Sequence, residues 1–168
     1  MLYYQYMEDI LGNIILSVFF LSNIYFLYDK SKLFIVFLFG FFINEILNLL
    51  LKGIIQQPRP TENYRLFNLE LLNIKRSKSK EPLISYDRYG MPSGHAQFAL
   101  YSTIYIYLAL KNTTVTTCYI LLSLSTLYQR VVFGYHTISQ VIVGAIIGLS
   151  VGYVAFLVGS RPSHSNGL

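Results

Sequence analysis

The chain has 168 residues, of which 54% are hydrophobic and only 12% are charged. Soluble domains average about 25% charged residues, so this composition excludes an ordinary soluble domain and favours one domain, residues 1–168, built for lipid. The net charge is +5, and most of the basic residues fall between Lys52 and Arg88. In a membrane protein this charge fits an anionic substrate better than a nucleic acid, and we expect no nucleic-acid partner.

Two apolar stretches near the start of the chain predict transmembrane helices, each of which needs about 20 residues. They run from Ile10 to Tyr28 and from Leu33 to Leu51, joined by a polar turn. The sequence before the first stretch lacks a basic segment and carries Glu8 and Asp9, which is atypical of a cleaved signal peptide. We therefore expect the first helix to stay in the membrane as an anchor.

Polar residues follow one face of the second predicted helix toward its end. At spacings of three or four, they are Asn44, Glu45, Asn48 and Lys52. Such a stripe can hydrogen-bond a neighbouring helix, and that interpretation stays open for Asn44. Because an ionisable residue inside a membrane span is costly, we expect Glu45 and Asn48 to support Lys52 instead.

The only long polar segment covers residues 53–89, on the face where we expect the active site. Two prolines flank Arg59 and end the second helix. The apolar residues between Asn63 and Ile74 predict a short helix on the membrane surface. The basic run over residues 75–80 predicts a solvated or headgroup-facing loop, to which we assign no catalytic role.

A short turn, Met91-Pro92-Ser93-Gly94-His95, leads into the third predicted helix. Ser93 is a favourable N-cap, and Gly94 lets the backbone approach a ligand closely. The unpaired N–H groups of a helix start attract phosphate, and His95 stands where it could pass a proton to such an anion. The alternative is an ordinary helix start with an incidental histidine, since a short motif alone is weak.

Three further apolar helices are predicted in the second half of the chain. They cover residues 94–110, 113–128 and 137–158. In the last of them, Gly144, Gly148 and Gly152 recur every four residues, which lets a neighbouring helix pack closely. The sequence thus predicts an all-α, multi-pass transmembrane bundle of about five spans, followed by a short polar tail over residues 160–168.

Five spans place four helix ends on one membrane face, with the residues suited to phosphate chemistry: Lys52, Arg59, Ser93, His95, Arg130 and His136. The three cations could bind a phosphoryl dianion. The sequence offers no cluster of Asp or Glu to hold a metal ion, so these cations would stabilise the charge in place of a metal. One histidine could attack phosphorus while the other protonates the leaving oxygen. Gln140, four residues after His136, lies on the same helical face and could accept its N–H.

Three blocks of this sequence resemble the signature motifs of the type 2 phosphatidic acid phosphatase superfamily. In the same order and at the same spacings, they are Lys52-x6-Arg59-Pro60, Pro92-Ser93-Gly94-His95 and Arg130-x5-His136. The resemblance implies that His136 is the nucleophile, which forms a phosphohistidine, and that His95 is the general acid. It implies no metal or other cofactor. The phosphate-binding residues that it implies are Lys52, Arg59, Ser93, Gly94 and Arg130.

Two positions depart from the superfamily pattern. Gln129 stands where a serine is usual, and Gln140 stands where an aspartate is usual; a glutamine can orient the nucleophile but adds no charge. The sequence from His136 to Gln140, with Gln97 and the stripe that ends at Lys52, resembles the dolichyldiphosphatase branch, which carries glutamine here. The resemblance implies a polyprenyl diphosphate substrate, first of all dolichyl diphosphate, cleaved to the monophosphate and phosphate in support of protein N-glycosylation.

Two other functions stay open. A phosphatase of the same fold could act on undecaprenyl diphosphate, phosphatidate or another lipid phosphate, and a substrate panel would distinguish these. A non-catalytic membrane protein could only bind lipid phosphate, and His136→Ala would distinguish that class. The dolichyl resemblance implies an active site on the lumenal face of the endoplasmic reticulum, whereas a count of basic residues alone would turn it to the cytosol. No oligomeric state is predicted.

Overall fold

In the computed structural model, the described residues are 2–60 and 89–162, and side chains are described from Gly12 onward. The regular structure in these ranges is entirely helical. The five helices are α1 (Leu2–Leu27), α2 (Ser31–Ile55), α3 (Gly94–Leu110), α4 (Thr113–Val132) and α5 (Ile138–Ser160). The predicted all-α architecture is therefore confirmed.

Helix α3 has the predicted bounds, whereas the other four are longer or shifted. Helix α4 continues past Tyr128, so Arg130 lies in its last turn rather than beyond it. A helix commonly ends next to a glycine in the left-handed conformation, and after Tyr128 the first such residue is Gly134, at φ 70°. Helix α2 likewise runs on until Gln56, at φ 51°. The predicted surface helix over 63–74 and the basic run over 75–80 lie outside the described residues.

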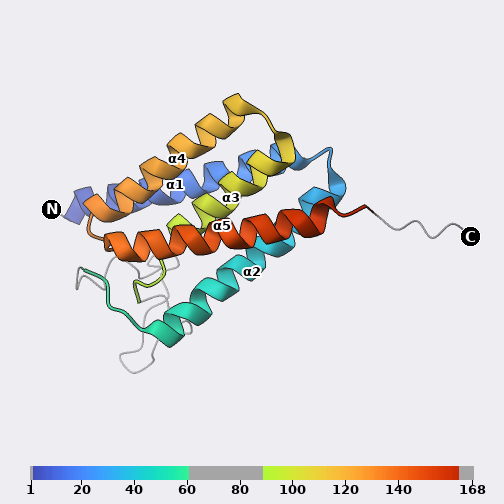
Figure 1. Ribbon diagram of the computed structural model, residues 1–168. Coiled ribbons are helices and arrows are strands. Elements are labelled where there is room, and N and C mark those ends of the chain that lie inside the picture. Colours follow the sequence, from blue (N-terminus) through green and yellow to red (C-terminus); the bar gives the residue numbers. More distant parts are fainter. Residues whose placement is uncertain (1, 61–88, 163–168) are drawn as a thin grey trace, which may run out of the picture.

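Helix α3 lies at the centre of the bundle and contacts all four other helices, as Figure 1 shows. Its closest neighbour is α5, whose glycines face the α3 backbone. A Cβ at Gly144 or Gly148 would overlap a main-chain carbonyl oxygen of α3 or its cap, and one at Gly152 would lie 2.7 Å from another. The close packing predicted from the glycine repeat is confirmed, and it fixes the start of α3 against the start of α5.

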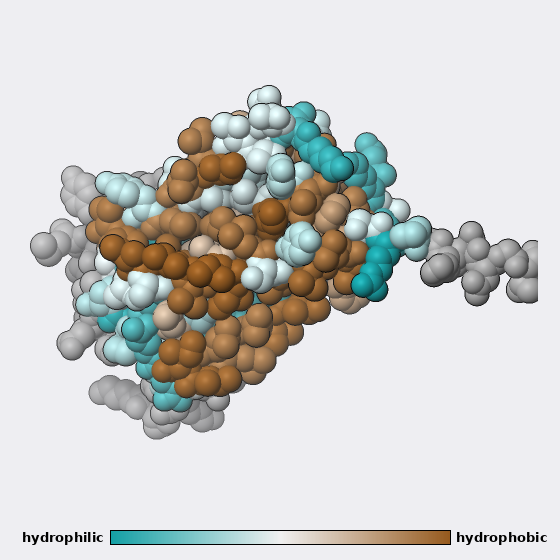
Figure 2. All heavy atoms as spheres, in the orientation of Figure 1, coloured by the Kyte–Doolittle hydropathy of each residue, from teal (hydrophilic) through white to brown (hydrophobic). Residues whose placement is uncertain are grey.

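The outside of the bundle is apolar. Helices α2 and α5 are long and apolar enough to cross a membrane, with only 22% and 28% of their apolar stretches buried inside the protein. Figure 2 shows hydrophobic residues over the middle of one face and hydrophilic residues toward its two ends. A helix buried in a soluble core would hide this surface, whereas lipid accepts it at no cost.

The two ends of the bundle differ in what they bring together (Figure 1). We call one the site end, where α2 and α4 finish and α3 and α5 begin. We call the other the turn end, where short connections join α1 to α2 and α3 to α4. All the residues predicted to act on phosphate belong to helix ends or loops at the site end.

Candidate active site

Five side chains of the predicted site share one electrostatic environment. The charges of Arg59, Lys52 and Arg130 act on the ring of His136, and the same three charges act on the ring of His95. The two histidine rings also interact with each other. Of the five, Lys52, Arg130 and His136 are buried. The structure therefore brings together residues that are up to 84 positions apart in the sequence.

The two ring nitrogens of His136 have different partners. Nδ1 lies 2.9 Å from the carbonyl oxygen of Gly90 and 3.2 Å from Oε1 of Gln140. Both of these atoms only accept hydrogen bonds, so Nδ1 carries the proton. On the other side, Nε2 lies 3.1 Å from Nη1 of Arg59, which can only donate. In the neutral ring, Nε2 therefore holds the lone pair and points at a cation.

The amide of Gln140 is fixed by groups on both of its sides. Its Oε1 also accepts from the backbone N–H of Thr137, at 3.1 Å. Its Nε2 donates to the Pro58 carbonyl at 2.9 Å and to Oε1 of Gln57 at 3.2 Å. The local cause is a capping box, because Thr137 caps α5 and receives the Gln140 backbone N–H in return. These contacts hold Oε1 toward His136.

The pKa of His136 is held well below its usual value of 6.5. Burial is the largest cause, and the positive charges of Arg59, Lys52 and Arg130 lower the pKa further. The hydrogen bond that the ring donates to Gln140 acts in the opposite direction. Near neutral pH the ring is therefore uncharged, and the lone pair on Nε2 is available.

Arg130 organises the corner that carries His136. Its carbonyl oxygen accepts the His136 backbone N–H at 3.0 Å, and its guanidinium carbon lies 4.6 Å from the centre of the Tyr135 ring. Nη1 of Arg59 donates to the Tyr135 carbonyl at 3.4 Å. Gly12 of α1 leaves room for the guanidinium, because a Cβ there would overlap it. The two arginines thus reach the same corner from different segments, Arg130 from the last turn of α4 and Arg59 from the loop after α2.

The start of α3 holds Ser93 and His95 as the sequence predicts for a capped helix. Oγ of Ser93 accepts from the backbone N–H of Ala96 at 3.5 Å, and the Ser93 N–H donates to the Gln140 carbonyl at 3.0 Å. Nε2 of His95 is buried and has no hydrogen-bond partner among the described residues. A buried polar atom in this position leaves one hydrogen bond for a ligand to complete.

The polar stripe of α2 faces α3. Nδ2 of Asn48 donates to the Pro92 carbonyl at 3.3 Å and to Oε1 of Gln97 at 2.8 Å. Nε2 of Gln97 donates in turn to Asn44, at 2.8 Å to its backbone and 2.9 Å to its side chain. These bonds join α2 to the turn before His95, which favours the helix–helix interpretation for Asn44. The support of Lys52 by Glu45 and Asn48 stays a prediction.

Two groups that contact the site have no role predicted from the sequence. Gln57 bonds Gln140, and Gly90 supplies the carbonyl that faces His136. For Gln57, its place inside the block from Lys52 to Arg59 was the one feature of the sequence that pointed to the site. Among the side chains that the structure describes, no group of three or more His, Cys, Asp or Glu is placed to hold a metal ion.

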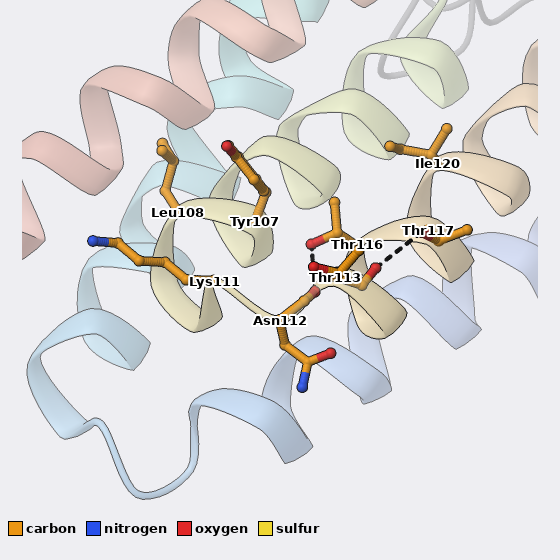
Figure 3. A pocket seen from close by; sticks show the side chains of 8 residues that line it. All are labelled: Tyr107, Leu108, Lys111, Asn112, Thr113, Thr116, Thr117 and Ile120. Carbon is orange, nitrogen blue, oxygen red and sulfur yellow. Dashed lines mark hydrogen bonds between the residues drawn. The ribbon is translucent and has the colours of Figure 1, made fainter.

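A cavity of about 480 Å³ lies at the turn end, between α3 and α4. Figure 3 shows its lining, which includes Tyr107, Lys111 and Asn112. Two of its threonine hydroxyls bond carbonyls four residues earlier, that of Thr116 to Asn112 at 2.7 Å and that of Thr117 to Thr113 at 2.9 Å. None of the predicted site residues lines this cavity, which separates it from the candidate active site.

Comparison with known proteins shows which sequences this chain resembles. The family model described as the PAP2 superfamily matches residues 33–162. Dolichyldiphosphatase from Saccharomyces cerevisiae is 33% identical over 130 residues, which cover 71% of this chain and 49% of the yeast protein. Dolichyldiphosphatase 1 from Homo sapiens is 34% identical over 131 residues, which cover 68% of this chain and 48% of the human protein.

The chain thus spans about half the length of the curated relatives that it matches. No solved structure matches it. The family match covers the second to fifth helices and every residue of the candidate site. The chain therefore belongs to the PAP2 superfamily.

Proposed function

We propose that this chain is an integral-membrane phosphatase that hydrolyses a polyprenyl diphosphate, first of all dolichyl diphosphate, through a phosphohistidine. The observation that carries the proposal is the tautomer of His136, with Nδ1 held between two acceptors and Nε2 directed at Arg59. This is the form in which an imidazole attacks phosphorus. The dolichyl substrate is inferred from the names of the relatives and from Gln140.

In the first step, the lone pair of His136 Nε2 attacks the terminal phosphorus. An N–P bond forms, and the P–O bond to the lipid monophosphate breaks with its electron pair on oxygen. His95 donates a proton to that oxygen. The positive charge that develops on the His136 ring is stabilised through Nδ1 by the two acceptors, Gly90 and Gln140. Lys52, Arg59 and Arg130 offset the charge on the phosphoryl oxygens, which is why the proposal requires no metal.

In the second step, a water molecule attacks the phosphohistidine. His95, now neutral, takes the proton from the water as the new P–O bond forms. The N–P bond breaks, its electrons return to Nε2, and inorganic phosphate leaves. His136 is again neutral with its proton on Nδ1, and the sum of the two steps is hydrolysis of the diphosphate.

The membrane setting follows from the surface of the bundle. The apolar exterior would keep the polyprenyl tail in the bilayer, so that only the diphosphate meets the cations at the site end. We extend the proposal to several membrane crossings, to the endoplasmic reticulum membrane and to a lumenal active site, because dolichyl diphosphate is the carrier left after N-glycosylation.

The test is phosphate release by the purified protein from dolichyl diphosphate, set against phosphatidate, with a metal chelator present. We expect release from dolichyl diphosphate that survives chelation and is abolished by His136→Ala, but not by His164→Ala, which removes the third histidine of the chain. A rapid quench with substrate labelled at the terminal phosphate should leave an acid-labile label on the native protein only. Absence of activity in the native protein would favour a lipid-binding role instead.

A further inference from the structure

Gln57 stands between the end of α2 and Arg59, and the mechanism above gives it no role. Within the described part of the chain, Gln57 bonds both groups that accept the Nδ1 proton of His136, namely Gly90 and Gln140. We propose that Gln57 is a positioning residue that holds these two acceptors in place and thereby sets the tautomer of the nucleophile. The inference rests on the proposed function in taking His136 as that nucleophile.

The first connection runs through the backbone. The Gln57 carbonyl oxygen accepts the Gly90 N–H at 2.8 Å. The carbonyl of the same glycine accepts from His136 Nδ1 at 2.9 Å. The two peptide groups that meet at Gly90 are thus both bonded, one to Gln57 and the other to His136. The Gln57 bond holds the segment that presents the Gly90 carbonyl to the imidazole.

The second connection runs through side chains. Oε1 of Gln57 accepts from Nε2 of Gln140 at 3.2 Å, and Oε1 of that glutamine accepts from His136 Nδ1 at 3.2 Å. Removing the Gln57 amide would leave the two N–H groups of the Gln140 amide with one acceptor among the described residues, the Pro58 carbonyl. The Gln140 amide would then be free to rotate away from the imidazole.

The two connections are packed against each other. A Cβ at Gly90 would lie 2.6–2.7 Å from the amide atoms of Gln140, so the glycine backbone fits directly against that amide. Two residues after Gln57, Arg59 faces the other ring nitrogen at 3.1 Å. One short segment, residues 57–59, therefore supports both Nδ1 and Nε2 of the nucleophile. Because it orients the nucleophile, loss of this support should lower kcat and leave KM unchanged.

The neighbouring glutamine gives a matched control. Gln56 is exposed, and its side chain donates to the Gly53 carbonyl at 2.9 Å, outside the site. Asparagine tolerates its left-handed backbone. Asparagine at position 57 keeps the backbone bond to Gly90 but is one methylene too short to reach Gln140. We expect Gln57→Asn to lower kcat for dolichyl diphosphate roughly tenfold, as one lost hydrogen bond predicts, with KM unchanged. Gln56→Asn should match the native protein.

The second readout is ¹⁵N NMR of labelled histidine in the detergent-solubilised protein, with His136→Ala used to assign the signals. In the native protein we expect a protonated Nδ1 and an unprotonated Nε2 for His136, and in Gln57→Asn a mixture of tautomers. A native tautomer in Gln57→Asn, or equal losses of kcat in both variants, would overturn the role of Gln57. If the native protein releases no phosphate from any lipid phosphate, the proposed function fails, and the NMR comparison still decides for or against Gln57.

Discussion

The site end and the turn end are held by different kinds of hydrogen bond. At the site end the bonds are buried and join distant segments, as between His136 and Gly90 or between Asn48 and Gln97. At the turn end the threonine hydroxyls are exposed and bond carbonyls four residues earlier in the same helix, as Thr117 does to Thr113. When a buried hydrogen bond is lost, a polar group is left without a partner and out of reach of water. When an exposed hydrogen bond is lost, water takes the place of the missing partner. Bonds of the first kind hold the candidate catalytic groups rigidly in place.

The two ends also use their cations differently. At the turn end, Nζ of Lys30 donates to the Ala109 carbonyl at 2.7 Å and is exposed, so the charge covers the end of α3 and is screened by solvent. At the site end, Lys52 and Arg130 are buried beside two histidines. Charges in that setting are strong enough to bind a dianion and to hold an imidazole neutral. Each of the following substitutions tests a difference between the site end and the turn end.

The largest effect is expected from His95→Asn, which removes the proposed general acid at the site end. Without it, kcat should fall by about 10²–10⁴ on phosphatidate, because its leaving group is an alkoxide. The leaving group from dolichyl diphosphate is a phosphate monoester with a second pKa of about 6, which needs a proton far less. We therefore expect a clearly smaller loss on the diphosphate. Steady-state kcat on both substrates checks this, and equal losses would assign His95 another role.

A glycine pair compares the packing at the two ends. Gly144→Ala should displace the start of α5 from the Ser93 carbonyl. The overpacking should lower the free energy of unfolding by about 1–3 kcal/mol and move the candidate catalytic groups. A displacement of about 1 Å can lower kcat roughly 10²-fold. At the other end of α5, a Cβ at Gly159 would meet side-chain atoms of Leu33 and Tyr105 at 3.0 and 3.2 Å.

The ends of those side chains can adjust, so Gly159→Ala should leave kcat nearly unchanged. Phosphate release and the midpoint of thermal unfolding, measured on both variants, make the comparison. If both alanines had the same effect on kcat, the packing at the site end would have no special importance for catalysis.

Local sequence rules predicted what depends on neighbours in the chain. The bounds of α3 and the cap at Ser93 follow from the turn before them, and the convergence of the cations follows from counting spans. The partners of Gln140 could not be predicted in this way. Gln57 and Pro58 are more than 80 residues away from it, and only the docking of α5 against α3 decides which groups its amide meets.

A smaller effect, and one of pH, is expected from Gln140→Glu. A carboxylate next to Nδ1 favours the charged imidazole, so the low pKa of His136 should rise. The proposed mechanism requires the neutral ring of His136, so the acid limb of the pH profile should move to higher pH. The carboxylate also cannot donate to the Pro58 carbonyl, and we expect kcat on the plateau to fall roughly tenfold, or by about 1.4 kcal/mol.

The measurement for Gln140→Glu is kcat as a function of pH on dolichyl diphosphate. Gln129→Glu serves as the control, since it adds the same charge at a neighbouring buried position in α4 without replacing the His136 contact. An acid limb that stays in place in Gln140→Glu would mean that this side chain does not control the ionisation of the nucleophile.

The smallest effect is expected at the turn end, from Asn112→Ala. Asn112 caps α4, with its Oδ1 accepting the Val115 N–H at 3.0 Å, so its loss should cost about 1 kcal/mol of the free energy of unfolding. Its bond is local and exposed, and α4 continues for five turns before it reaches Arg130. The variant should therefore unfold at a lower temperature with an unchanged kcat. A fall in kcat here would mean that the turn end influences catalysis through α4, and that the two ends are not independent.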